Sequence, residues 1–215
     1  MTSVGFIGSG RIGSVLAKLS VAAGYDVLLS NSRGPQTLTD LAAATGAKAV
    51  TSAEAAQADL VVVSIPVKAY ASVPAIDGKV VMDTGNYYPA RDGQIAELDD
   101  GALTSSELLA RQVPEAKVVK VFNNIYFKHL ENLARPGTAA DRSYLPIAGD
   151  DPGAKAAVTA YLDAIGYGTV DAGSLADGRR QEPGTALYGA PYGQVENEQG
   201  VTASQQVIRT ALTAG

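Results

Sequence analysis

The sequence of 215 residues contains no cysteine and a single histidine, His129. Without cysteine the chain has no disulfide, no thiolate nucleophile and no thiolate ligand for a metal. Because tetrahedral zinc sites are built from several histidine and cysteine side chains, one histidine alone also argues against such a site. We therefore expect neither a metal centre nor thiol chemistry.

Positive charge is in short supply too, with 17 lysines and arginines against 22 aspartates and glutamates and a net charge of −5. A chain with this balance lacks the broad positive field that attracts a phosphate backbone, so we expect no nucleic-acid partner. No apolar run approaches the roughly 18 residues that span a bilayer. Met1 is followed almost at once by the apolar residues 4–7, which leaves no room for a signal peptide. We expect a cytoplasmic protein that does not enter a membrane.

Short apolar runs alternate with stretches of helical spacing along the chain. Runs typical of buried parallel strands occupy residues 4–7, 26–30, 47–50, 60–65, 79–83, 118–122, 144–148 and 168–170. Helical patterns or helix-start signals follow Gly10, Gly34, Thr51, Thr104 and Asp151, and a closing helix is expected over residues 201–212. The repeated β–α–β units predict a Rossmann-type α/β fold, with a doubly wound, mainly parallel sheet and a short C-terminal extension.

The first strand is followed by the glycine pattern G-x-G-x-x-G, which is Gly8-Ser9-Gly10-Arg11-Ile12-Gly13 here. It lies between a strand and a helix, as the phosphate-binding turn of a dinucleotide site does. In that setting Gly8 allows the tight turn, Gly10 lets the backbone approach the pyrophosphate, and Gly13 permits close packing of helix on strand. The free N–H groups at the helix start favour the phosphate charge. The alternative is a glycine turn without a ligand, and the surrounding elements favour the nucleotide.

The end of the second strand indicates which dinucleotide binds. Sites for NAD usually carry Asp or Glu about 20 residues past the glycine motif, on the ribose 2′-hydroxyl. Here the chain has Asn31, Ser32 and Arg33 instead. Arg33 can pair with a 2′-phosphate, and Asn31 or Ser32 can donate hydrogen bonds to it. These residues predict NADP(H), the alternative for Arg33 being a solvated side chain in a turn.

Candidate residues for the nicotinamide end follow the next three strands. In an open α/β sheet the ligand crosses the carboxyl ends of the strands. Ile65 and Pro66 close the fourth strand, so we expect them beside the nicotinamide and its ribose. Asn86 and Asn123 follow the fifth and sixth strands, and either amide can orient the nicotinamide carboxamide or a substrate carbonyl. The alternative for both is that they stabilise turns.

Three tyrosines, Tyr126, Tyr188 and Tyr192, are candidates to line an aromatic substrate pocket, with core packing as the alternative. His129 lies several residues past the sixth strand, where we expect an exposed or structural role. The sequence shows no Tyr-x-x-x-Lys pair on a helix and no Ser/His/Asp arrangement, so no catalytic side chain is assigned.

Residues 1–172 are therefore expected to form the dinucleotide-binding domain. Residues 173–215 are expected to pack on it as an irregular loop and a closing helix, within a single-domain protein. The segment 174–200 is rich in Gly, Pro and Tyr, and a compact domain seldom carries so long an irregular loop without a functional reason.

Over nearly all of its length the sequence resembles the NADP oxidoreductases that depend on the deazaflavin coenzyme F420, and the related oxidoreductase domain of the membrane ferric reductases. The resemblance rests on Gly8-Ser9-Gly10-Arg11-Ile12-Gly13, Asn31-Ser32-Arg33, Ser64-Ile65-Pro66, Val119-Lys120-Val121-Phe122-Asn123, Ala148-Gly149-Asp150-Asp151 and Asp171-Ala172-Gly173-Ser174-Leu175. It implies hydride transfer between the nicotinamide C4 and the C5 of a stacked deazaflavin, in which positioning supplies most of the acceleration.

The resemblance further implies a homodimer. From their positions in the sequence we expect Asn123 and Tyr126 on the substrate side. Some members carry a histidine near the position of Asn123, where this chain has asparagine. Two alternatives stay open. One is an NADPH-dependent reductase of another small-molecule acceptor, such as a flavin, a quinone or an imine. The other is an NADPH-binding sensor without turnover, because a fold does not determine a function.

Overall fold

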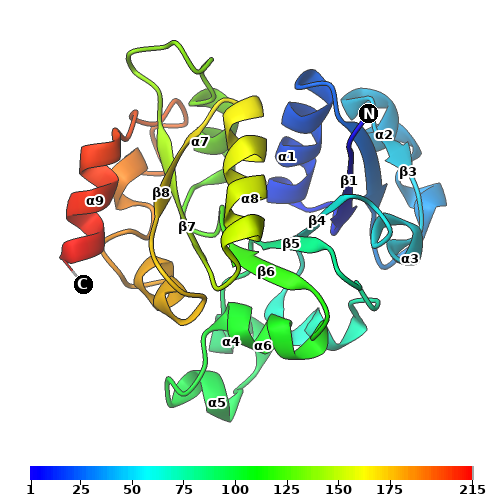
Figure 1. Ribbon diagram of the computed structural model, residues 1–215. Helices are drawn as coiled ribbons and strands as arrows, with labels where there is room; N and C mark the ends of the chain where they lie inside the picture. The colour runs from blue at the N-terminus through cyan, green and yellow to red at the C-terminus, as the bar shows by residue number, and fades with distance from the viewer. Residues whose placement is uncertain (215) are drawn as a thin grey trace.

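The computed structural model describes residues 1–214, in which eight strands form one sheet with helices on both faces (Figure 1). The strands are β1 (Ser3–Ile7), β2 (Asp26–Ser30), β3 (Lys48–Ala49), β4 (Leu60–Val63), β5 (Val80–Asp83), β6 (Lys117–Lys120), β7 (Tyr144–Gly149) and β8 (Gly168–Asp171). The α-helices are α1 (Arg11–Ala22), α2 (Thr39–Thr45), α3 (Ser52–Ala55), α4 (Pro89–Asp92), α5 (Ala96–Asp99), α6 (Ser105–Gln112), α7 (Phe127–Asn132), α8 (Pro152–Ala164) and α9 (Gln205–Thr213). The 3₁₀ turns are η1 (Pro35–Thr37), η2 (Val67–Ser72), η3 (Ala176–Gln181) and η4 (Ala190–Tyr192).

The strand order is β3-β2-β1-β4-β5-β6-β7-β8. Strands β1 to β6 pair in parallel, whereas β7 runs antiparallel to β6 and β8 is parallel to β7. The Rossmann-type, mainly parallel α/β fold expected from the sequence is thus confirmed. The chain moves outward from β1 to β3 and then returns to start β4 on the other side of β1. Such a reversal opens a crevice at the carboxyl ends of the strands, where ligands of this architecture bind.

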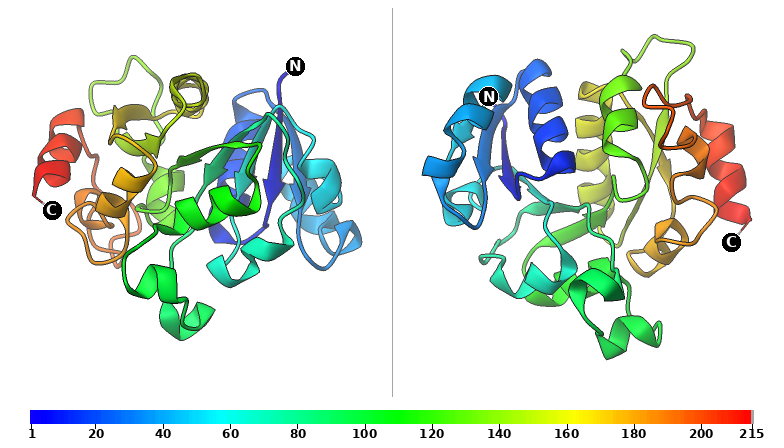
Figure 2. Two further views of the ribbon diagram at one scale, coloured as in Figure 1. Left: turned by 60° about the horizontal axis from the view of Figure 1, so that its bottom comes forward. Right: turned by 180° about the vertical axis from the view of Figure 1, so that it is seen from behind.

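Two apolar clusters fill the two faces of the sheet, because alternate residues of each strand point to opposite sides. In β4, Val62 belongs to one cluster and Val61 and Val63 to the other. Helices α1 and α8 cover the first face side by side, with the Ser20 and Tyr161 hydroxyls 2.7 Å apart between them. Helix α6 covers the opposite face from α8 (Figure 2). The sheet edge that carries the crevice is held between these two packed layers.

Strands β4 and β6 each end two residues before the sequence indicates. The strand expected over residues 60–65 ends at Val63, and the strand expected over 118–122 ends at Lys120. Apolar residues follow Val63 and Lys120, but the hydrogen bonds between strands stop at these residues and the chain turns into the crevice. Phe122 marks such a turn with φ 68°, the only positive value for a non-glycine residue within residues 1–214.

Two helices begin later than expected. After Gly34 the chain first makes the 3₁₀ turn η1, in which both the amide and the hydroxyl of Thr37 donate to the Gly34 carbonyl, and α2 starts only at Thr39. The closing helix starts at Gln205 instead of residue 201. The backbone before it is engaged elsewhere, because Tyr144 donates its N–H to the Ala203 carbonyl.

The irregular segment 174–200 contains the 3₁₀ turns η3 and η4. The short helices α4, α5 and α7 are also absent from the elements expected from the sequence.

Within residues 1–214 no helix combines the length and apolar character that crossing a bilayer requires.

Candidate functional site

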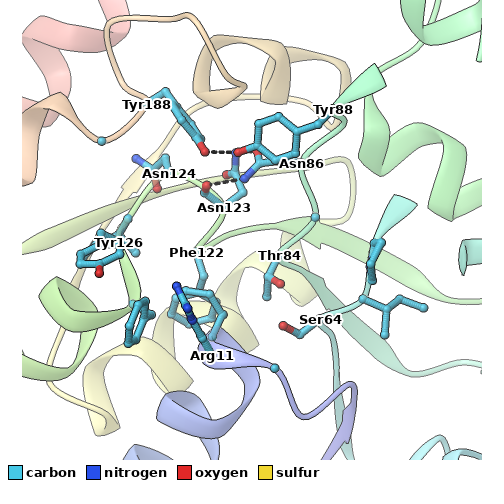
Figure 3. A pocket seen from close by; sticks show the side chains of 18 of the residues that line it. Arg11, Ser64, Thr84, Asn86, Tyr88, Phe122, Asn123, Asn124, Tyr126 and Tyr188 are labelled. Carbon is cyan, nitrogen blue, oxygen red and sulfur yellow. Dashed lines mark hydrogen bonds between the residues drawn. The ribbon is translucent and has the colours of Figure 1, made fainter. Parts of the chain in front are cut away.

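A cavity of about 560 Å³ opens at the carboxyl ends of the central strands (Figure 3). Its size falls within the range of ligand-binding pockets. The lining comes from the β1–α1 turn, from the chain after β4, β5 and β6, and from the loop before α9. The lining residues are Gly10, Arg11, Ile12, Ser64, Ile65, Pro66, Thr84, Gly85, Asn86, Tyr88, Arg91, Phe122, Asn123, Asn124, Ile125, Tyr126, Phe127, Tyr188, Gly189 and Val195.

The three motif glycines have different reasons to be glycine. Gly8 has φ 114°, and a Cβ there would overlap the Ser64 carbonyl. A Cβ on Gly13 would overlap the Gly8 carbonyl. By contrast, Gly10 has an ordinary φ of −71°, and a Cβ on it would meet nothing within 4 Å. The fold therefore requires Gly8 and Gly13, whereas Gly10 keeps open a space at the start of α1.

That open space fits a dinucleotide pyrophosphate. The first amides of the twelve-residue helix α1 have no partner in the preceding turn of the helix, and no side chain caps them. Free amides and the helix dipole favour a phosphate at this point. A Cβ on Gly10 would fill the space that such a phosphate needs.

The residues after β2 form an exposed turn beside this entrance. Asn31 Oδ1 accepts a hydrogen bond from the Arg33 amide at 2.9 Å, and Asn31 Nδ2 donates to Thr37 at 3.0 Å. Asn31 thus shapes the turn, while Ser32 and Arg33 are exposed. The Arg33 guanidinium has no hydrogen bond or ion pair within residues 1–214, so it is free to meet a ligand. None of these three residues lines the cavity itself.

Two hydroxyls point into the cavity from the ends of β4 and β5 (Figure 3). They belong to Ser64 and Thr84, and neither forms a side-chain hydrogen bond with another residue in the 1–214 range. Ile65 and Pro66 line the same wall, where the sequence analysis places them. Thr84 is absent from the sequence candidates. It directly follows β5, so its position after a strand could have indicated it in the way that it indicated Asn86 and Asn123.

Asn86 and Asn123 meet across the edge, and their amides bind each other. Asn86 Nδ2 donates to the Asn123 carbonyl at 2.7 Å, and Asn123 Nδ2 donates to Asn86 Oδ1 at 3.0 Å and to the Gln181 carbonyl at 2.6 Å. Asn123 is only 5% exposed, and its buried Oδ1 has no partner in the described chain. The hydrogen bonds of these two side-chain amides therefore mainly stabilise the carboxyl edge of the sheet, and Asn123 Oδ1 is the acceptor that remains without a partner.

The adjacent Phe122 is fully buried and has a positive φ. This conformation costs a phenylalanine about 1–2 kcal/mol. It is the bend by which the chain leaves β6 and brings Asn123 to the cavity. Backbone strain of this kind is common where a site must be positioned.

Aromatic rings form the outer walls of the cavity. Tyr88 and Tyr188 are joined through their hydroxyls, which links the chain after β5 to the loop before α9 (Figure 3). Burial and the contact with Tyr188 raise the pKa of Tyr88 well above its ordinary value, so Tyr88 stays a neutral phenol. Tyr126 lies edge-on to Phe127, with 4.6 Å between the ring centroids.

Two arginines stack on these walls. The Arg11 guanidinium lies 5.2 Å from the centre of the Phe127 ring, and that of Arg91 lies 4.9 Å from the centre of the Tyr88 ring. Arg91 also pairs with the buried Asp92 at 2.8 Å. Tyr88, Arg91 and Phe127 were not among the sequence candidates, because nothing in their local pattern distinguishes them from surface residues.

Tyr126 and Tyr188 line the cavity, but Tyr192 does not. Tyr192 is fully buried, and its hydroxyl donates to the Tyr144 carbonyl at 2.9 Å, so it packs in the core. His129 is 1% exposed, and its ring nitrogen lies 2.8 Å from the Asn197 carbonyl. Its role in the structure is to tie α7 to the loop that precedes α9.

Comparison with known proteins adds a family to this geometry. Residues 3–87 match the family model described as NADP oxidoreductase, coenzyme F420-dependent. The chain is 29% identical over 183 residues to metalloreductase STEAP3 of Rattus norvegicus, covering 83% of this chain and 35% of that protein. It therefore spans about a third of the length of this curated relative.

Two solved structures have the same fold. A hypothetical protein of Sinorhizobium meliloti superposes with a TM-score of 0.74 at 32% identity, covering 86% of this chain and 91% of that one. A protein of Arthrobacter sp. FB24, provisionally named an F420-dependent NADP reductase, gives a TM-score of 0.69 at 21% identity, with 83% and 88% covered. The matched region contains the glycine turn and the ends of β2, β4 and β5. Over residues 3–87 the chain is thus similar to the NADP oxidoreductases described as coenzyme F420-dependent.

Proposed function

We propose that the protein transfers a hydride between NADP(H) and a deazaflavin of the coenzyme F420 type. One observation carries the choice of acceptor: among the residues that line the cavity there is no histidine, lysine, aspartate or glutamate, and two of the three lining tyrosines, Tyr88 and Tyr188, have their hydroxyls bonded to each other. Reduction of an imine or a carbonyl benefits from an acid that protonates the heteroatom. Exchange of a hydride between two flat rings depends instead on holding them face to face at reacting distance.

The dinucleotide is assigned to the crevice edge. Bound NADPH supplies a hydride from the nicotinamide C4, and a deazaflavin accepts it at C5. Helix α1 and the open space at Gly10 hold the pyrophosphate, and Arg33 with its neighbours holds the 2′-phosphate. Ile65 and Pro66 flank the nicotinamide end. The complete proposed cofactor set is Gly8, Ser9, Gly10, Arg11, Ile12, Gly13, Asn31, Ser32, Arg33, Ile65, Pro66 and Asn86.

The acceptor is assigned to the aromatic side of the cavity. Tyr126 offers an apolar face to a flat ring, and Asn123 lines the same side of the cavity. The joined phenols of Tyr88 and Tyr188 cover this side and reduce the access of water. Because Tyr88 stays neutral, the pair acts through hydrogen bonding and packing.

The test is the oxidation of NADPH, followed through the absorbance of the reduced nicotinamide, with and without oxidised coenzyme F420. We expect rapid turnover with NADPH only when the deazaflavin is present, and little turnover with NADH. FMN, a quinone, a cyclic imine and a ferric chelate serve as comparison acceptors, the last because one relative is named a metalloreductase.

Turnover with one of these acceptors and none with the deazaflavin would overturn the assignment of the acceptor but keep the reductase. Tight NADPH binding without oxidation by any acceptor would instead support a sensor.

We also propose that the protein works as a cytoplasmic homodimer. The outer side of α9 carries Val207, which is 44% exposed, next to Ala211 and Ala214. A second copy would cover this apolar strip.

A further inference from the structure

A buried polar cluster lies directly behind the cavity wall at Gly85. Asp83 at the end of β5 and Lys120 at the end of β6 are register partners in the sheet, and neither has any exposed surface. The cluster is completed by Tyr70 of η2 and by Ser105 and Ser106 at the start of α6. We call these five residues the Asp83–Lys120 cluster. Burying an ammonium group and a carboxylate stabilises a fold less than apolar packing of the same volume, so the cluster calls for a functional explanation.

The cluster holds both polar groups of the Gly85 residue. Asp83 Oδ1 accepts a hydrogen bond from the Gly85 amide at 2.9 Å, and Lys120 Nζ donates to the Gly85 carbonyl at 3.2 Å. The Tyr70 hydroxyl donates to the same Asp83 oxygen at 2.7 Å and lies where a Cβ of Gly85 would be. Gly85 is therefore fixed by two charged groups and by direct steric contact.

Lys120 is the centre of the cluster. Its three N–H donors have three acceptors: the Gly85 carbonyl, Ser105 Oγ at 2.9 Å and Ser106 Oγ at 3.2 Å. Ser106 Oγ donates onward to Asp83 Oδ2 at 2.6 Å, and Ser105 Oγ donates to Glu182 Oε1 at 3.1 Å. Each serine hydroxyl thus accepts a hydrogen bond from the ammonium group and donates one to a carboxylate. Through Glu182 the cluster also reaches the loop that carries Tyr188.

Gly85 separates two residues that face the cavity. Thr84 presents its free hydroxyl on one side, and Asn86 is locked to Asn123 on the other. We propose that Lys120 is a positioning residue, which holds residues 84–86 in the arrangement that aligns the nicotinamide with the hydride acceptor. This inference rests on the proposed function, because it takes the nicotinamide to lie at this wall.

The test compares Lys120→Met, which keeps the length of the side chain without its charge, with Lys117→Met as the control. Lys117 is on the same strand, but its side chain is 51% exposed and pairs with Asp151. For Lys120→Met we expect the single-turnover rate of hydride transfer at saturating NADPH and F420 to fall about 10- to 100-fold. The Kd for NADPH should change by less than about threefold, since Gly10 and Arg33 remain in place.

Ser105→Ala provides a second variant in case Lys120→Met does not fold. It removes one acceptor of the ammonium group and should lower the transfer rate about three- to tenfold, with NADPH affinity unchanged. Equal transfer rates in folded Lys120→Met and wild type would overturn the proposal. If Lys120→Met is unfolded, a wild-type rate in Ser105→Ala would do so.

The fluorescence of bound NADPH gives a readout that needs no acceptor. We expect its lifetime and anisotropy to change in Lys120→Met and Ser105→Ala but not in Lys117→Met. If the wild type oxidises no NADPH with F420, the proposed function fails, and this fluorescence comparison alone decides the role of Lys120. Identical fluorescence in all four proteins would then overturn the positioning role.

Discussion

Arg33 lies on an exposed turn whose shape is set by its neighbour. Asn31 Oδ1 accepts a hydrogen bond from the Arg33 amide and so orients the backbone of Arg33. The Arg33 guanidinium has no protein partner within the described chain. The planar guanidinium of an arginine that is held at its backbone but free at its head can donate two hydrogen bonds to the oxygens of a phosphate. Its contribution to binding should therefore depend on the 2′-phosphate and not on the rest of the dinucleotide.

Arg33→Ala should weaken NADPH binding about 10- to 100-fold and NADH binding by less than about twofold, because one charge-assisted contact is worth roughly 1.5–3 kcal/mol. Fluorescence titration with both nucleotides measures this, and Arg209→Ala on α9 is the exposed control. Equal losses for NADPH and NADH would remove Arg33 from phosphate recognition.

At the same scale, the sequence located the polar residues of the edge but not their pairing. Asn86 and Asn123 each follow a strand, which is enough to place them at the carboxyl edge. Their reciprocal hydrogen bonds depend on the register that sets Asp83 opposite Lys120 and on the positive φ of Phe122. Neither is encoded in a local pattern, so the free Asn123 oxygen and the free Thr84 hydroxyl became visible only in three dimensions.

Among the elements, the β1–α1 unit has one glycine that the fold requires and another that the proposed nucleotide binding requires. Gly13 is needed where α1 crosses close to the backbone of the turn, and Gly10 is surrounded by open space. Two substitutions of the same chemical size should therefore have opposite effects on stability and on affinity.

Gly10→Ala should change the free energy of unfolding by less than about 1 kcal/mol but weaken NADPH binding at least about tenfold, because the methyl group occupies the phosphate space. Gly13→Ala should lower the free energy of unfolding by about 1–3 kcal/mol through overpacking. Urea unfolding and NADPH titration of both variants measure the two effects. Full NADPH affinity in Gly10→Ala would show that the pyrophosphate lies elsewhere.

Long periodic elements were predictable, and very short ones were not. α1 and α8 have the apolar spacing and the bounding glycines that predict a helix. α4 and α5 have four residues each, too few to be stable without tertiary contacts. α4, for instance, is held by Asp92, which accepts hydrogen bonds from the Tyr88 and Lys68 amides. The contact with Lys68 comes from a more distant part of the chain and leaves no local signal.

For the whole molecule, burial of tyrosine links stability to alkaline pH. Tyr161, Tyr167 and Tyr192 are buried in the first apolar cluster and Tyr70 in the second. Burial raises the pKa of all four above the ordinary value of 10.0. The folded state therefore keeps these protons at pH values where the unfolded chain has lost them.

Stability should consequently be unaffected by these groups below pH ~10 and should fall above it, by about 1.4 kcal/mol per pH unit for each tyrosine. Circular dichroism and tyrosinate absorbance recorded together from neutral to strongly alkaline pH measure this. We expect the buried tyrosines to ionise only as the protein unfolds. Their ionisation near pH ~10 with the fold intact would contradict the assignment.

The reversed direction of β7 divides the cavity between two parts of the chain. Because β7 opposes β6, the carboxyl ends of β7 and β8 lie at the far edge of the sheet, and residues 144–171 contribute nothing to the cavity lining. The loop that carries Tyr188 and Val195 closes this side instead. The cavity is thereby built from two separate stretches of sequence, the chain up to Phe127 and the loop that carries Tyr188 and Val195. In evolutionary terms, that loop can change and reshape one wall of the cavity while the β1–α1 turn and the ends of β4, β5 and β6 are inherited unchanged.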